Sequence, residues 1–90
     1  MGLLAAGQVV VLPFPFSDLS RHKYRPVLVL ADACRGDWIA CQITSNPYYV
    51  RPGKLFTAHA DLMEQIVGTV KSDFLNRARE AVIQVIRGKP

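Results

Sequence analysis

The sequence predicts a mainly β domain with one C-terminal helix, arranged as a small barrel or a strongly bent sheet that the helix covers. Short runs of β-branched and aromatic residues alternate with Gly, Pro and polar turn formers, a pattern typical of strands. The C-terminal stretch instead repeats apolar residues at helical spacing. The chain has 90 residues, half of them hydrophobic, which predicts one folded domain and argues against disorder.

The first predicted strand is Gln8–Leu12, which follows a glycine and is rich in valine. Pro13 and Pro15 have no N–H to donate, so pairing must end there or lie at a sheet edge. The polar stretch 17–24 is predicted to be an exposed loop. Val27–Leu30 is apolar on both faces, which predicts a central strand.

Turn formers divide the middle of the chain. A turn at 35–37 leads into a third strand, Trp38–Thr44, which ends at the turn formers of 45–47. Pro52-Gly53 predicts a break. Further short elements are expected at Lys54–Thr57 (extended), near Asp61–Gln65 (a helical turn) and at Ile66–Val70 (extended).

An amphipathic helix is predicted from Ser72 onward. Ser72 suits the N-cap, and Asp73 lies in the first turn, where the helix dipole favours a negative charge. Gly88 and Pro90 suit the end of the helix. Its apolar stripe consists of Phe74, Ala78, Ala81, Val82, Val85 and Ile86.

Charge and cysteine content narrow the class of protein. The net charge of +4 and the isoelectric point of about 9.4 fit an anionic partner, either RNA or an acidic protein, or serve solubility alone. Cys34 and Cys41 are expected to be buried free thiols, which indicates a reducing compartment. The N-terminus lacks the pattern of a signal peptide and no stretch is long enough to cross a membrane, so we expect a soluble cytoplasmic protein.

Three stretches, in this order and spacing, resemble the MazF/PemK toxin family, and the Pro-Phe-Pro-Phe sequence is most similar to its PemK-like branch. They are 7–20 (GQVVVLPFPFSDLS), 25–30 (RPVLVL) and 41–45 (CQITS). The later stretch 51–57 (RPGKLFT) is also similar to the family. With the terminal helix, the resemblance spans nearly the whole chain.

The resemblance implies an SH3-like small barrel of the MazF/CcdB type that works as a homodimer. It implies the toxin of a type II toxin–antitoxin system, an endoribonuclease that cleaves single-stranded RNA without a metal ion or other cofactor. It further implies an antitoxin partner whose acidic, flexible tail covers the RNA groove. A non-catalytic SH3-like binding module, or a toxin relative that inhibits a protein target, is the alternative.

One feature departs from the family. Members usually carry a further hairpin-sized stretch before the segment that resembles 51–57, whereas here Tyr48 runs directly into Tyr49. Either this single toxin domain, residues 1–90, has lost that stretch, or a mobile segment is missing between Tyr48 and Tyr49. We expect the second, because losing strands or their connection would expose core and unpaired edges.

The family pattern places four residues in candidate catalytic roles. Arg25 corresponds to the family's Arg-Pro arginine and would stabilise the phosphate, because guanidinium is planar and always charged. The hydroxyl of Thr44 would bind the scissile phosphate, and Arg51 corresponds to an arginine that acts in some PemK-type members. His22, in the first long loop, has a side-chain type that can transfer protons near neutral pH. The PemK-type members that use the arginine at the position of Arg51 have an aspartate two residues later as the proposed general base. This chain has Gly53 at that position, so the general base of the reaction is unassigned.

Other residues are candidates for holding RNA, and for Ser45 and the tyrosines a structural role is the alternative. Tyrosines could stack on unpaired bases, although half-buried barrel tyrosines are the simpler interpretation. The lone residues His59 and Trp38 are expected to be structural, with Trp38 in the core or a dimer interface. The RNA-binding candidates are Ser45, Lys23, Lys54 and Tyr48, with Tyr24 and Tyr49 as further stacking candidates.

Overall fold

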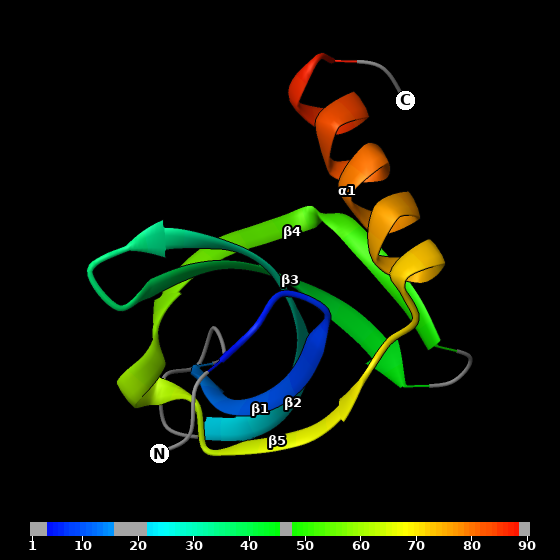
Figure 1. Cartoon of the computed structure of the whole chain (residues 1–90). Helices are drawn as coiled ribbons and strands as arrows, with labels where there is room; N and C mark the ends of the chain where they lie inside the picture. The colour runs from blue at the N-terminus through cyan, green and yellow to red at the C-terminus, as the bar shows by residue number, and fades with distance from the viewer. Residues whose placement is uncertain (1–3, 16–21, 46–47, 89–90) are drawn as a thin grey trace.

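A computed structural model describes residues 4–15, 22–45 and 48–88, with side chains described for 4–12, 25–43, 51–52 and 54–88. Five antiparallel strands form one sheet in the order β4-β3-β2-β1-β5. The sheet curls into an open, barrel-like shape, and the C-terminal helix packs outside it (Figure 1). The elements are β1 (Gln8–Pro15), β2 (His22–Cys34), β3 (Asp37–Ser45), β4 (Tyr48–His59), η1 (Ala60–Leu62), β5 (Gln65–Thr69) and α1 (Ser72–Ile86). The predicted fold class is confirmed.

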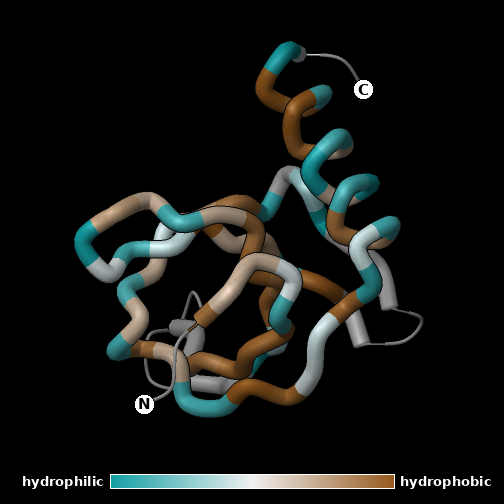
Figure 2. Tube along the Cα trace, viewed as in Figure 1, coloured by the Kyte–Doolittle hydropathy of each residue, from teal (hydrophilic) through white to brown (hydrophobic). Residues whose placement is uncertain are grey.

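Strand alternation divides the core into two clusters. The barrel cluster lies inside the curved sheet, and the helix cluster lies between the sheet and α1, so the central strands are apolar on both faces (Figure 2). The barrel cluster is Val10, Leu12, Val27, Val29, Ala40, Ala58 and Met63, with Trp38 packed against it. The helix cluster is Val9, Leu28, Leu30, Cys41, Ile43, Ala78 and Val82. The prediction that Trp38 is structural is thus confirmed.

Helix α1 is attached to the sheet by apolar packing and by the hydrogen bonds of one arginine side chain. Its buried residues are Ala78 and Val82, both from the predicted apolar stripe. The guanidinium of Arg79 donates two hydrogen bonds to the carbonyl of Leu30, from Nε at 3.2 Å and Nη2 at 2.8 Å. The predicted N-cap is wrong by one residue, because the N-cap is Lys71 and no side-chain bond caps the helix.

Three other expectations need correction. Strand β2 begins at His22, so 22–24 is not part of the loop; residues 17–21 lie outside the described part. Pro52-Gly53 does not break the chain, because β4 continues through it as a bulge: Gln42 lies opposite Arg51, but its neighbour Cys41 lies opposite Leu55. Cys34 is exposed rather than buried, although both cysteines are free.

The two N-terminal prolines fit the predicted edge position. Pro13 and Pro15 pair with β2, but the ladder between β1 and β5 ends at Val11 and Gln65. The missing N–H groups therefore lie where β1 has a partner on one side only. The described part of the chain has no helix that is both long and apolar enough to cross a membrane.

The hairpin between β2 and β3 requires glycine at position 36. Gly36 has φ of +85°, and a Cβ there would lie 2.6 Å from Nε2 of His59. His59 is held in place because its Nδ1 accepts a hydrogen bond from the amide of Asp61 at 3.1 Å. His59 thus has the structural role that the sequence predicts.

Gly36→Ala is expected to lower the free energy of unfolding by about 1–3 kcal/mol, because it adds both positive-φ strain and a steric clash. Urea unfolding measures the effect. Gly68→Ala is the matched control, since Gly68 lies outside the positive-φ region and a Cβ there would meet no atom within 4 Å. Equal losses in the two variants would contradict the assignment.

Because the Cys41 thiol is buried, we expect the free energy of unfolding to fall at alkaline pH. Burial raises its pKa from 9.0 to about 11. The unfolded chain releases this proton near pH 9 while the folded chain keeps it. The thiol's contribution is therefore complete below pH 9, and it is lost as the pH rises from about 9 to about 11. We expect Cys41→Ala to show a shallower decline over this window in urea unfolding. An identical decline in wild type and variant would contradict this.

Candidate nucleic-acid site at one end of the sheet

Arg25 lies on the barrel-facing side of β2, at the end where the core gives way to solvent. It pairs with Leu12 of β1 and precedes Val27 by two residues, and both of those residues belong to the barrel cluster. Because residues two apart on a strand share a face, Arg25 continues the row of Val27 and Val29. Unlike them, Arg25 is exposed.

The position of Thr44 follows from the register of the next strand. The last pair between β2 and β3 joins Val27 to Gln42. Arg25 and Thr44 each lie two residues beyond this pair, so both occupy the same end of neighbouring strands. Along β3, Thr44 lies two residues after Gln42. The register therefore brings the two positions together, which is the arrangement a phosphate site needs.

Arg51 adds a second cation, from strand β4. It lies directly opposite Gln42 on β4 and is exposed. A line across β2, β3 and β4 thus contains Val27, Gln42 and Arg51. Paired residues lie on the same side of a sheet, so Arg51 occupies the face of Arg25. We define Arg25, Gln42, Thr44 and Arg51 as the barrel-end site.

Gln42 is the member that sequence reasoning missed. It is half-buried between a core valine and an exposed arginine. An amide in this position can donate to a phosphate oxygen or to a base edge. The available signal was its spacing, since it lies two residues before Thr44 on a predicted strand.

The remaining candidate residues from the sequence lie at other positions along β2, β3 and β4. Lys54 is exposed within the bulge of β4, directly before the register resumes at Leu55. The backbone of Lys23 pairs with Phe14, and that of His22 pairs with Pro15, further along β2 from Arg25. Ser45 pairs with Tyr48 at the β3–β4 turn. The side chains of His22, Lys23, Tyr24, Thr44, Ser45, Tyr48 and Tyr49 lie outside the described part.

The electrostatic character of the barrel-end site is positive. Its described charged groups are Arg25 and Arg51, with Lys54 nearby. The described acidic groups belong to other regions: Asp32 and Asp37 lie at the opposite end of the β2–β3 ladder. The remaining ones lie in or beside η1, β5 and α1 and are Asp61, Glu64, Asp73 and Glu80. The described residues therefore supply cations for a phosphate but no carboxylate base.

No group of three or more His, Cys, Asp or Glu side chains within the described ranges is placed to hold a metal ion. The described residues therefore assign neither the general acid nor the general base of a reaction at this site. Proton transfer by His22 stays a prediction from the sequence.

Comparison with solved structures identifies the fold. An endoribonuclease in complex with its cognate antitoxin from a mycobacterial species superposes with a TM-score of 0.70 and 19% sequence identity, over 100% of this chain and 98% of that chain. The MazF–MazE structure from Deinococcus radiodurans gives a TM-score of 0.71 and 20% identity, over 94% of this chain and 96% of that chain. No family model and no curated protein matches the sequence. The similarity is one of three-dimensional structure, and it shows that this chain has the same fold as these two proteins.

Proposed function

We propose that this chain is a MazF/PemK-type toxin of a type II toxin–antitoxin system, an endoribonuclease that cleaves single-stranded RNA without a metal ion. The observation that supports the proposal is the strand register, which brings the Arg25 and Thr44 positions to the same end of neighbouring strands, with Arg51 on the next strand. The solved structures that share the fold are described as an endoribonuclease with its cognate antitoxin and as a MazE–MazF complex.

In this reaction the ribose 2′-oxygen attacks the adjacent phosphorus, and the bond from phosphorus to the 5′-oxygen breaks. The products are a 2′,3′-cyclic phosphate and a 5′-hydroxyl, so no water is consumed. The guanidinium of Arg25 would hold the phosphate oxygens while negative charge builds on them. The Thr44 hydroxyl would hydrogen-bond the same phosphate, and Gln42 and Arg51 would bind the strand on either side.

The proposed partners follow from the same assignment. RNA and an acidic antitoxin both suit a chain of net charge +4. A homodimer is supported by the last turn of α1, where Val85 and Ile86 are 45% and 71% exposed, because a small domain gains stability by covering such surface. A cytoplasmic location, which we propose as part of the same assignment, would give the protein access to cellular RNA and to a newly made antitoxin.

The test uses the purified chain, a labelled single-stranded RNA and excess EDTA. We expect cleavage that leaves a cyclic phosphate, and we expect no cleavage when the nucleotide at the cut carries a 2′-deoxyribose. The failure to cut any of a panel of RNA sequences would overturn the nuclease proposal and would favour a non-catalytic binding module. A short acidic protein encoded beside this chain, able to suppress the cleavage, would identify the antitoxin.

A further inference from the structure

Gln42 adds to the barrel-end site a group that phosphate binding does not require. Phosphate oxygens accept hydrogen bonds, and the guanidinium groups of Arg25 and Arg51 only donate them. The amide of Gln42 instead carries both a donor, Nε2, and an acceptor, Oε1. Of the barrel-end side chains that the structure describes, Gln42 alone can accept a hydrogen bond.

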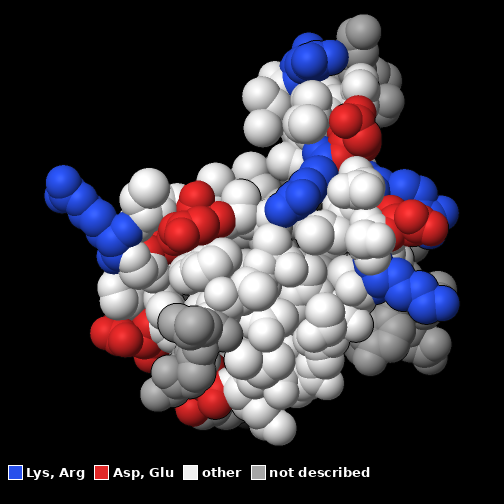
Figure 3. Space-filling model, in the orientation of Figure 1, with Lys and Arg blue, Asp and Glu red and all other residues white. Residues whose placement is uncertain are grey.

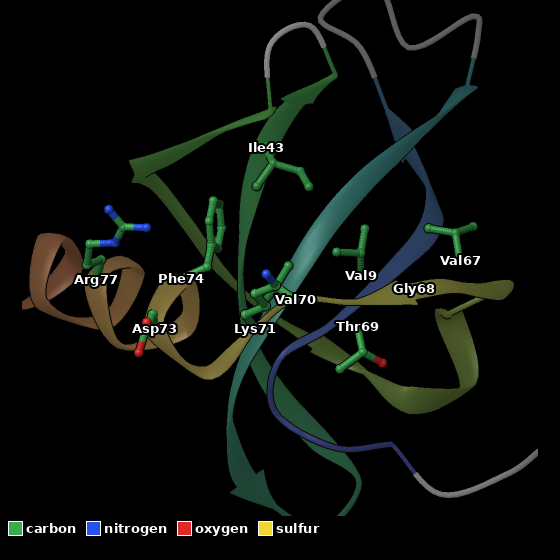
Figure 4. A pocket seen from close by; sticks show the side chains of 10 residues that line it. All are labelled: Val9, Ile43, Val67, Gly68, Thr69, Val70, Lys71, Asp73, Phe74 and Arg77. Carbon is green, nitrogen blue, oxygen red and sulfur yellow. The ribbon is translucent and has the colours of Figure 1, made fainter.

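The two faces of β3 place the Gln42 side chain on the barrel side of the sheet. Its neighbours in sequence, Cys41 and Ile43, both belong to the helix cluster, and Figure 4 shows Ile43 among the side chains that line a pocket beside Phe74 of α1. Successive side chains of a strand point to opposite faces, so Gln42 points to the other face. Its partner on β2 is Val27, which is fully buried in the barrel cluster.

The amide of Gln42 is available to a ligand. No hydrogen bond joins this side chain to another residue in the described part of the chain, and no unpaired polar side-chain atom there is fully buried. The ladder is interrupted beside Gln42, because residues 52–54 of β4 lie between the partners of Gln42 and Cys41. Bulges often lie next to active sites, where they redirect a side chain. A half-buried amide loses hydration, and a hydrogen bond to a ligand would compensate that loss.

Gln42 lies deeper in the barrel than the proposed phosphate position. Arg25 is two residues from Val27, the partner of Gln42, so the two levels are about 7 Å apart along the strands. In RNA a ribose separates each base from its phosphate. A base whose phosphate is held by Arg25 can therefore reach Gln42 when it turns toward the barrel, because the bases of single-stranded RNA are free to splay out.

The balance of donors and acceptors selects the part of the base that Gln42 contacts. A carbonyl oxygen of uracil or guanine can accept hydrogen bonds from the arginines. The exocyclic amino group of cytosine or adenine is a donor, and beside two cations it needs an acceptor, because a donor left unpaired in a site costs free energy. The acidic side chains Asp32 and Asp37 lie at the far end of the β2–β3 ladder, and Figure 3 shows acidic groups near that hairpin. The acceptor is therefore Oε1 of Gln42.

We propose that Gln42 is a specificity-determining residue of the nuclease, whose Oε1 accepts a hydrogen bond from the exocyclic amino group of a base next to the phosphate that Arg25 holds. The preferred base at that position is then cytosine or adenine, which carry this group where uracil and guanine carry a carbonyl oxygen. The inference rests on the proposed function, since it names the base that the same site takes. Gln42 thus helps to decide where RNA is cut, while Arg25 stabilises the charge.

The test compares pairs of RNAs that differ at one nucleotide flanking the mapped cut. Uracil replaces cytosine in one pair and hypoxanthine replaces adenine in the other, so each replacement exchanges the amino group for a carbonyl oxygen. Single-turnover cleavage by the wild-type chain should be about tenfold faster on the amino member of at least one pair, the size of effect that one hydrogen bond to a base supplies. The two pairs distinguish cytosine from adenine as the preferred base.

Two substitutions assign the preference to Gln42. Gln42→Met has a similar length but no amide, so the rates on the two members of a pair should become nearly equal. Gln42→Glu keeps an acceptor, so it should keep the preference while lowering both rates, because the carboxylate repels phosphate. A purely structural role would lower both rates without changing their ratio. The matched control is Gln84→Met, which should leave the ratio unchanged, since Gln84 is half-buried on α1, on the other face of the sheet.

Equal wild-type rates within both pairs would overturn the proposal, as would a preference that persists in Gln42→Met. Loss of the preference in Gln42→Glu would also contradict it, so the test stays decisive if Gln42→Met fails to fold. If the chain cuts no RNA, the nuclease proposal fails, and fluorescence anisotropy tests the base contact separately with oligocytidine against oligouridine and oligoadenosine against oligoinosine. Tighter binding of an amino member that Gln42→Met abolishes would leave the contact standing without cleavage. Cleavage without discrimination would leave the nuclease without this contact.

Discussion

Arg25→Gln is expected to slow RNA cleavage by about two to three orders of magnitude, the usual effect of removing one donor to a developing negative charge. Glutamine keeps much of the length and polarity but cannot supply a full positive charge or a forked pair of donors to phosphate. Arg25 is exposed, so the substitution leaves the core intact. Single-turnover cleavage of a labelled RNA in EDTA measures the effect.

Arg35→Gln is the matched control because it removes the same charge from the other end of β2. Arg35 is exposed in the turn before β3 and has φ of +59°, which glutamine tolerates about as well as arginine. Its cleavage rate should stay near that of the wild type. Equal losses in the two variants would mean that net charge alone matters, and full activity of Arg25→Gln would remove the barrel-end site from the mechanism.

Leu28→Ala is expected to lower the free energy of unfolding by about 2–5 kcal/mol, as large-to-small core substitutions do. Leu28 is fully buried on the central strand β2, paired with Val9 on one side and Cys41 on the other. The helix cluster to which it belongs attaches α1 to the sheet. A small domain is stabilised by only about 5–15 kcal/mol, so the loss should be visible as a large shift in the urea midpoint.

Leu62→Ala provides the comparison for the same deletion of side-chain atoms on the surface. Leu62 lies in η1 and is 53% exposed, so its removal should change the unfolding free energy by about 0.5 kcal/mol or less. If Leu28→Ala cost no more than Leu62→Ala, the described packing between α1 and the sheet would be wrong.

The sequence predicted those parts of the fold whose signals are local. Valine-rich runs, the Gly36 turn and the apolar stripe of α1 each indicated their element correctly. Errors arose where pairing overrode a local signal. Pro52-Gly53 suggests a break, but β3 pairs with β4 on both sides of it, so the turn residues become a bulge. The polar residues 22–24 suggest a loop, but they extend β2 against the proline segment of β1.

The candidate site was predictable only in part, for a related reason. The resemblance supplied Arg25, Thr44 and Arg51, and strand pairing is what places these three positions at one end of the sheet. Gln42 was missed because an amide in a strand has no distinctive pattern until its neighbours across the sheet are known. The expected missing segment between Tyr48 and Tyr49 stays a prediction.

The pairing of β1 with β5 has a consequence for how the protein is made. Strand β1 is synthesised before the other strands of the sheet, yet one of its two partners is β5, the last of these strands, which precedes the helix that covers Leu28 and Cys41. Closing so long a loop is slow and carries an entropic cost that local hairpins avoid. A growing chain can form the β2–β3–β4 meander early, but the sheet stays unfinished until β5 has been synthesised. The delay in completing the sheet is therefore set by the length of chain between β1 and β5.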